Sequence, residues 1–213
     1  MNFNQIKIIT DTMLKSEVPS DRYEAIIALG FCEKMFSIDS NEIDESIIYP
    51  YLKDEDDHVR YYCADALGYL NSKKSLTVLK SVLPVIDMGK SNKWIEENIK
   101  WAIFINETID IEKLDDKSII KIQYDLPVGS DGNKYIQYWL KYLKYKTDYL
   151  SKEEIIFDFS YLKYEFGDSI TSLWIETKIK RNIKTKILAS KETYNNLKSL
   201  IQNNGIECEI QES

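Results

Sequence analysis

Two short segments of this chain are near copies of each other. RYEAIIALG occupies residues 22–30, and RYYCADALG occupies residues 60–68. In each copy, small and apolar residues recur at positions i, i+3 and i+4, which is the spacing of one face of a helix. A single helix with such a face must be covered by a neighbour, so recurrence at this interval is typical of stacked helical pairs in an α-solenoid.

The repeated arginine and glycine each carry a prediction. Gly30 and Gly68 follow the last regular helical position, where a left-handed C-cap residue belongs. Arg22 and Arg60 are predicted to bond acidic turn residues or carbonyl groups of the adjacent repeat, because a guanidinium is a planar fork of donors. Phosphate binding by these arginines is the alternative, and the acidic surroundings argue against it.

Each copy is followed by a second apolar-periodic segment, at residues 42–54 and 75–86. These segments are predicted as the partner helices, with Ser40 and Ser72 at or near their N-caps. A third unit is predicted at residues 92–105, where apolar side chains, Trp94 among them, keep helical phase but the arginine and glycine are missing.

DEDDHVRYYCADALG, residues 54–68, resembles the HEAT-like repeat of the phycobilisome-lyase type. That family has an acidic turn, then Val-Arg, small residues and Ala-Leu-Gly, which fit Asp57, Val59, Arg60 and the residues that follow. The copy at residues 20–30 has Asp21 where the family has valine. The resemblance implies a helical repeat domain over residues 1–116 and says almost nothing about activity.

The charge of the chain, −7 overall, is unevenly distributed. Residues 1–116 carry 13 Lys and Arg against 22 Asp and Glu, whereas residues 117–213 carry 15 against 13. An acidic first half disfavours nucleic acid there and suits a basic protein partner, although solubility alone is an alternative explanation. The candidate partner-binding carboxylates are those of the acidic turn: Asp54, Glu55, Asp56 and Asp57.

From residue 117 the pattern changes to alternating strands and helices. Strands are predicted at residues 118–126, 154–160, 185–190 and 206–210. A turn-rich stretch is predicted at 127–133, and helices at 134–145, 169–181 and 191–205, the last with Gly205 as its C-cap. This order predicts a small α/β domain over residues 117–213 with a mostly parallel sheet of about four strands. The fold class is therefore α+β in two parts, an α-solenoid followed by this α/β domain.

The second half also resembles the STAS domain of anti-sigma-factor antagonists. Asp158 and Ser160 match the family's Asp-hydrophobic-Ser element after the central strand, and Asp168 and Ser169 match the Asp-Ser pair that opens the next helix. The resemblance implies a regulatory phosphoserine at Ser169. From the residues alone, Asp168 or Ser169 is an ordinary helix N-cap.

Tyrosines at helical spacing form a stripe in the 134–145 helix and just beyond it, with lysines interleaved. Tyr138, Tyr142, Tyr145 and Tyr149 follow the i, i+4, i+7 pattern. The stripe is interpreted as a seam against the helical half, as a face for a protein partner, or as a stacking platform for nucleic acid. Its first three tyrosines are candidate partner-binding residues.

Signals for catalysis, metals and membranes are weak. The one histidine and three cysteines lack metal-ligand spacing, so neither a metal nor a cofactor is expected. No apolar run approaches the length of a membrane span, no signal peptide is recognised, and cytoplasm is the expected compartment. Asp158, at the end of a buried strand, is the best single catalytic acid, but the sequence offers it no acid or nucleophile as a partner.

The sequence therefore favours a non-enzymatic cytoplasmic protein that binds another protein. The concrete hypothesis is a bacterial immunity or antitoxin-like protein that neutralises a basic effector through an acidic surface. Membrane, nucleic acid and small molecules are not the expected partners. A STAS-like partner switch controlled at Ser169 is the alternative, and an enzyme that uses Asp158 is the third hypothesis.

Overall fold

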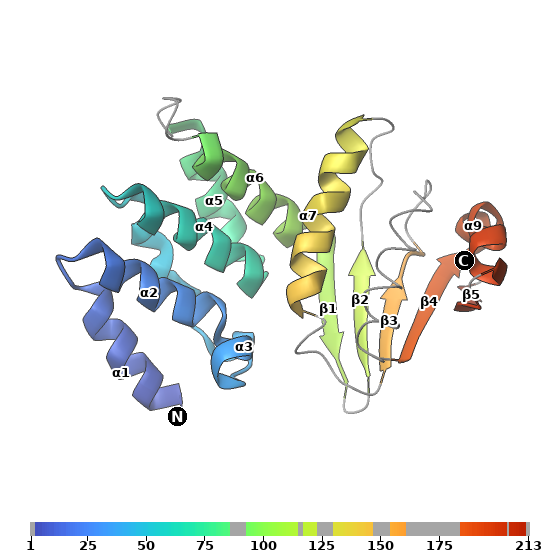
Figure 1. Cartoon of the computed structure of the whole chain (residues 1–213), viewed down its shortest axis with the longest axis horizontal. Helices are drawn as coiled ribbons and strands as arrows, with labels where there is room; N and C mark the ends of the chain where they lie inside the picture. Colours follow the sequence, from blue (N-terminus) through green and yellow to red (C-terminus); the bar gives the residue numbers. More distant parts are fainter. Residues whose placement is uncertain are drawn as a thin grey trace. The chain divides into compact units, whose positions relative to one another are not determined.

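The computed structural model describes residues 3–85, 93–114, 117–122, 130–146, 154–160, 184–203 and 205–211. The chain divides into two compact units, Met1–Glu107 and Thr108–Ser213. The first, here called the helical unit, consists of helices, and the second, the sheet unit, contains a five-stranded sheet (Figure 1). The fold is thus mixed α and β. The division lies before the expected boundary at 116/117, because Ile109–Lys113 already forms a strand of the sheet.

The helical unit contains two kinds of helix. The α-helices are α1 (Phe3–Leu14), α2 (Pro19–Gly30), α3 (Cys32–Phe36), α4 (Asp57–Leu70), α5 (Ser75–Val82) and α6 (Lys93–Thr108). Its 3-10 helices are η1 (Ser40–Glu42), η2 (Glu45–Lys53) and η3 (Leu83–Val85). The two sequence copies become α2 and α4, which pack against each other, and the third predicted unit becomes α6. The segment predicted as the first partner helix is 3-10 rather than α, and Pro50, which lacks an N–H, lies inside it.

Gly30 and Gly68 are not left-handed caps, and that prediction was wrong. Gly30 is the last residue of α2, Gly68 lies inside α4, and neither has a positive φ. A Cβ added at Gly30 would lie 2.4 Å from the Cβ of Ala66, and one at Gly68 would lie 2.3 Å from the indole ring of Trp101. The two glycines therefore allow successive helices to approach closely, α2 to α4 and α4 to α6.

The two serines predicted at or near N-caps are not caps themselves, although Ser72 lies near the start of α5. Ser40 is the first residue of η1, whose cap is Asp39, and η2 is capped by Asp44. Ser72 precedes α5, and its hydroxyl accepts a hydrogen bond from the amide of Lys74 at 3.3 Å. Aspartate caps as well as serine does, and its negative charge is also favoured at a helix start.

The core of the helical unit lies between the repeated helices. Its fully buried apolar side chains include most of the positions that the helical pattern marks: Ala25, Leu29, Cys63, Ala66, Leu67, Ile95, Ile99 and Ala102. Ala28, which the pattern also marks, is half-buried, whereas Ile26 and Val59 are fully buried although the pattern does not mark them. Burial of each large aliphatic side chain contributes about 1.5–3 kcal/mol. The stacking of neighbouring helices therefore stabilises faces that no single helix could bury.

The sheet unit has five strands in the order β1-β2-β3-β4-β5. They are β1 (Ile109–Lys113), β2 (Ser118–Ile122), β3 (Glu154–Asp158), β4 (Lys184–Ser190) and β5 (Glu207–Gln211). β1 and β2 are antiparallel, and the other neighbours are parallel. The mostly parallel arrangement is confirmed, but the sheet has one strand more than expected, because β1 was not recognised.

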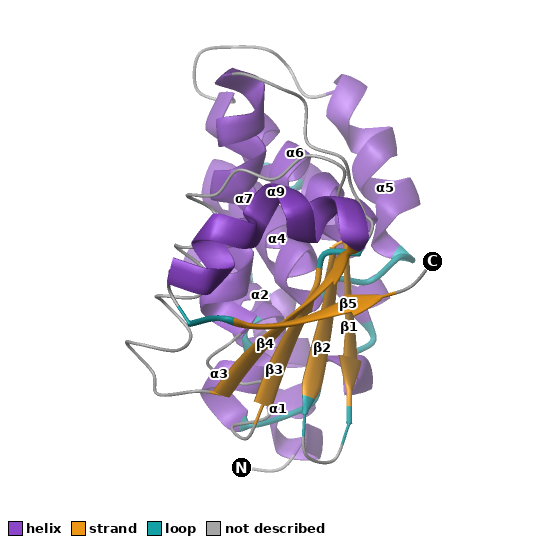
Figure 2. Cartoon of the chain, turned by 90° about the vertical axis from the view of Figure 1, so that its right-hand side faces the viewer, coloured by secondary structure: helices purple, strands orange, loops and turns teal. Residues whose placement is uncertain are grey.

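The helices of the sheet unit are α7 (Ser130–Lys146) and α9 (Lys191–Asn203). Figure 2 shows the strands side by side with α9 lying against them, and α9 contacts β4 and β5. Gly205, just after α9, has φ of 59°, which confirms the predicted C-cap. Residues 130–133 belong to α7 rather than to a turn, and the helix predicted at 169–181 lies outside the described residues. Within the described ranges, no helix is long and apolar enough to cross a membrane.

Candidate functional site

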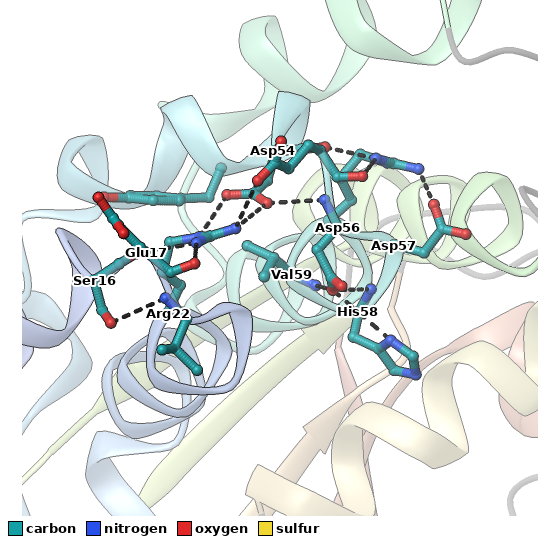
Figure 3. Close-up of polar contacts among 12 residues, drawn as sticks. Ser16, Glu17, Arg22, Asp54, Asp56, Asp57, His58 and Val59 are labelled. Carbon is teal, nitrogen blue, oxygen red and sulfur yellow. Dashed lines mark hydrogen bonds and ion pairs between the residues drawn. The ribbon is translucent and has the colours of Figure 1, made fainter.

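The acidic turn joins η2 to α4, and three of its four carboxylates are held by nearby groups (Figure 3). Asp54 accepts two hydrogen bonds from Arg22, at 2.9 Å from Nε and 2.8 Å from Nη2, and its side chain is 9% exposed. Asp56 caps α4, because its carboxylate accepts hydrogen bonds from the amides of His58 at 2.9 Å and Val59 at 3.1 Å. Asp57 forms an ion pair with Arg60. Three of the four carboxylates of this turn therefore interact with groups of the fold itself.

Arg22 and Arg60 make equivalent contacts in the two repeats. Nη1 of Arg22 donates to the two backbone carbonyls of residues 16–17 at 3.0 and 3.1 Å. Nη1 of Arg60 donates to the carbonyls of residues 54–55 at 2.5 and 3.0 Å. The hydrogen bond from Arg22 to Asp54 raises the pKa of the guanidinium. The prediction that these arginines bond groups of the adjacent repeat is confirmed for Arg22, which binds Asp54. Arg60 instead binds the turn that precedes its own helix and Asp57. The repeated arginine is therefore explained by the loop that precedes each helix.

Glu55 is the exposed carboxylate of the turn. Its side chain is 88% exposed, and it forms a long ion pair with Nη2 of Arg22 at 3.9 Å. The side chains of Asp56 and Asp57 are 29% and 36% exposed. Among the four predicted partner-binding acids, Glu55 is thus the one that points furthest into solvent.

Five aromatic rings lie beside this turn, and we call them the aromatic cluster: Tyr23, His58, Tyr61, Tyr62 and Trp94. The centroid of the Tyr62 ring is 5.3 Å from those of Tyr23 and Tyr61. The ring centroid of Trp94 lies 4.5 Å from that of Tyr61 and 5.8 Å from that of His58. The centroids of His58 and Tyr23 are 6.4 Å apart, so each ring neighbours two others. The cluster therefore joins α2, α4 and α6, and His58 and Trp94 are its exposed members.

The aromatic cluster was missed by the sequence analysis, which placed Trp94 in phase with the buried side chains of its helix. Trp94 is 38% exposed, whereas the neighbouring Ile95 and Ile99 are fully buried. A partial signal was present, because Tyr23 and Tyr61 occupy the same position after the repeated arginine. Their partners come from other helices, and only the stacking of those helices brings the rings together.

The tyrosine stripe of α7 does not form an exposed face. Tyr142 is fully buried, Tyr145 is 7% exposed, and Tyr138 is half-buried. Nζ of Lys146, itself 3% exposed, lies 5.8 Å from the centre of the Tyr145 ring. Tyr149 lies outside the described residues. Because two of its three candidate tyrosines are buried, we do not retain this stripe as a partner-binding surface.

The candidate acid of the sheet unit is part of a local turn. Asp158, 6% exposed at the end of β3, accepts a hydrogen bond from the amide of Ser160 at 3.0 Å. The hydroxyl of Ser160 donates to the side chain of Gln211 at 3.0 Å. Asp168 and Ser169 lie outside the described residues. In the part of the chain that is described, no group of three or more His, Cys, Asp or Glu side chains could hold a metal ion.

A polar pocket of about 330 Å³ lies at the opposite end of α4, between the 3-10 segment and the turn before α5. In its wall, Glu45 is 6% exposed and accepts from the hydroxyls of Tyr49 at 2.9 Å and Ser72 at 2.6 Å. Burial, with the hydrogen bond to Glu45, raises the pKa of Tyr49 well above its usual value. Because Glu45 ties η2 to the next repeat, its contacts have a structural explanation.

No family model, no curated protein and no solved structure matches this chain. The fold and the site together define a protein with a helical unit, a sheet unit and, in the helical unit, an aromatic cluster beside the acidic turn. A functional conclusion therefore has to be argued from the residues of that surface.

Proposed function

We propose that this protein is a non-enzymatic binding protein whose helical unit takes a basic protein partner. The observation that carries the proposal is the aromatic cluster, whose His58 lies 3.7 Å from Asp56 of the acidic turn that also holds the exposed Glu55. Trp and Tyr are enriched among the residues that dominate binding energy, and they act best when surrounded by groups that exclude water. Trp94 and His58 are exposed within a ring of half-buried tyrosines, which is such an arrangement.

The charge of the first half supports a basic partner. The helical unit, residues 1–107, carries 12 basic against 18 acidic side chains. A surplus of one sign steers an oppositely charged protein toward the surface and raises its association rate. The same field repels the phosphates of nucleic acid, so an aromatic surface in this setting favours a protein.

The repeat architecture is part of the proposal. Equivalent loop contacts of Arg22 and Arg60, and equivalent close contacts at Gly30 and Gly68, support a HEAT-like α-solenoid. Stacked repeats of this kind present an extended surface on which side chains of successive helices line up. The aromatic cluster, with members from α2, α4 and α6, fits such a surface.

The biological class that we propose is a bacterial immunity or antitoxin-like protein of the cytoplasm, which neutralises a basic effector such as a nuclease toxin. An acidic protein that covers a basic, nucleic-acid-binding surface competes directly with the phosphates that surface would bind. The net charge of −7 supports this role.

The test is affinity capture with the tagged full chain from native lysate, followed by identification of the retained proteins. The expected result is a basic protein that is retained by the wild type and lost with Glu55→Lys. Glu192→Lys, which reverses an exposed acid on α9 of the sheet unit, is the matched control and should retain the partner. Recovery of no basic protein above background, or equal recovery with both variants, would contradict the proposal.

A STAS-like partner switch remains a second proposal, supported by the position of Asp158-Phe159-Ser160 at the end of the central strand β3. Intact mass measured with and without phosphatase tests it. A phosphorylated fraction that disappears in Ser169→Ala is the expected result, and an unmodified chain with unchanged partners would exclude it.

A further inference from the structure

We infer that the aromatic cluster is an arginine-binding site, in which guanidinium groups of the basic partner stack on Trp94 and pair with Glu55. The inference rests on the proposed function and specifies its recognition chemistry. It assigns most of the specificity to one ring and one carboxylate, rather than to the acidic surface as a whole.

Trp94 is held in place before any partner arrives. Tyr61 packs against the indole, with 4.5 Å between ring centroids and 33° between ring planes. His58 meets it edge-on at 5.8 Å. Trp94 remains 38% exposed. A ring that is braced on two sides and open elsewhere offers a stacking face with little loss of side-chain freedom on binding.

His58 connects the aromatic cluster to the carboxylates of the acidic turn. Nδ1 of His58 lies 3.7 Å from Oδ1 of Asp56, and the imidazole also neighbours Tyr23. Within the turn, Asp54 is bound by Arg22 and Asp57 by Arg60. Glu55 is left as the carboxylate best able to take a new cation, because its pairing with Arg22 is long and its side chain is 88% exposed.

Arginine fits this combination better than lysine. Its guanidinium is planar, stacks on aromatic faces and binds a carboxylate through two parallel N–H donors, whereas lysine is a compact and strongly hydrated point charge. Tryptophan is the ring that binds cations best. Nucleobases also stack on tryptophan, but the phosphates attached to them would face Glu55 and the acidic turn.

The test is fluorescence anisotropy of the full chain with three labelled probes: an oligo-arginine peptide, an oligo-lysine peptide of the same length, and oligo-dT. Trp94→Ala and Trp94→Leu remove the ring, and Trp94→Leu keeps apolar bulk in case the alanine variant does not fold. Trp94→Phe keeps a ring. Tyr194→Ala, which removes a half-buried ring of the sheet unit, is the matched control.

The expected result is that wild type binds oligo-arginine about 2- to 5-fold more tightly than oligo-lysine, the range of one exposed cation–π contact. Trp94→Ala and Trp94→Leu should reduce that preference to the part that two-point pairing with Glu55 supplies, Trp94→Phe should keep more of it, and Tyr194→Ala should not change it. Glu55→Gln should weaken both peptides, and the more so at low salt.

Three results would overturn the inference. Equal affinity for the two peptides with dependence on Glu55 alone would leave a charge-only surface and would preserve the proposed function. Tight binding of oligo-dT that depends on Trp94 would identify a nucleic-acid platform instead. Absence of any peptide binding would remove the arginine site, while the capture experiment decides separately whether a basic partner exists.

Discussion

Gly30 offers the sharpest test of how the repeats are held together. In Gly30→Ala, the new Cβ would lie 2.4 Å from the Cβ of Ala66 and 2.6 Å from its Cα. Both distances are far below van der Waals contact, and the second involves backbone, which cannot rotate away. Helices α2 and α4 must therefore separate for alanine to be accommodated.

The expected magnitude follows from two opposing effects. Alanine favours the helix by up to about 1 kcal/mol over glycine. Overpacking typically costs about 1–3 kcal/mol, and backbone contact places this site at the upper end. We therefore expect Gly30→Ala to lower the free energy of unfolding by about 2 kcal/mol, measured by urea denaturation followed by circular dichroism.

Two comparisons separate close packing from a cap. At a left-handed cap, asparagine is tolerated better than alanine, whereas in a tight contact the larger side chain is worse. Gly30→Asn should therefore cost more than Gly30→Ala. At Gly205, where φ is 59° and a Cβ would meet open space, the order should reverse. Adding Ala66→Gly to Gly30→Ala should recover part of the loss, because only the 2.4 Å contact is relieved.

The reasoning would be refuted by a Gly30→Ala protein as stable as the wild type, or by a Gly30→Asn protein more stable than the alanine variant. Either result would mean that the α2–α4 contact is looser than its geometry indicates.

Three further predictions concern individual groups. Arg22→Lys cannot keep both the two-point contact with Asp54 and the loop carbonyls, so it should lower the free energy of unfolding by about 1–3 kcal/mol in the same denaturation assay; an unchanged midpoint would contradict this. Asp56→Ala should lower it by about 1 kcal/mol and Asp56→Ser by less, because serine still caps α4. Burial raises the pKa of the Cys63 thiol, so Cys63 should react with a thiol reagent only when the protein unfolds. The partly exposed Cys208 should react in the folded protein. Because the folded state holds the Cys63 proton more tightly, its contribution to stability is full below the unfolded thiol pKa of about 8.5 and falls as the pH rises above it.

The sequence predicted the elements with strong periodicity and missed those that depend on neighbours. The repeated helices and the parallel strands follow from apolar spacing that each segment carries itself. β1 was missed because it continues directly from α6 without a glycine or proline to mark the change. The role of Gly30 was misassigned because a cap and a close contact both require the absence of Cβ, and only the position of Ala66 distinguishes them.

For the candidate site, helical spacing did not predict which side chains are exposed. Helical spacing correctly grouped Tyr138, Tyr142 and Tyr145, but spacing defines a stripe and does not say whether that stripe is covered. Trp94 presents the opposite case, since its phase matched that of buried neighbours and yet it stands at the first turn of α6, where its indole remains partly exposed. The exposure of Trp94 follows from its position at the start of the helix, and apolar periodicity does not report where a residue lies along a helix.

The contacts of the acidic turn also limit what net charge can explain. Asp54, Asp56 and Asp57 stabilise the start of α4 and its link to α2, so their charges are largely offset within the fold. An ion pair at an exposed surface contributes little, about 0–1 kcal/mol, and salt screens it. If recognition relied on surface charge alone, a partner would be held weakly and with little selectivity. A partly exposed ring that packs against Tyr61 and His58 supplies what charge cannot, and for this reason we expect substitution of Trp94 to change partner selectivity more than substitution of Asp57.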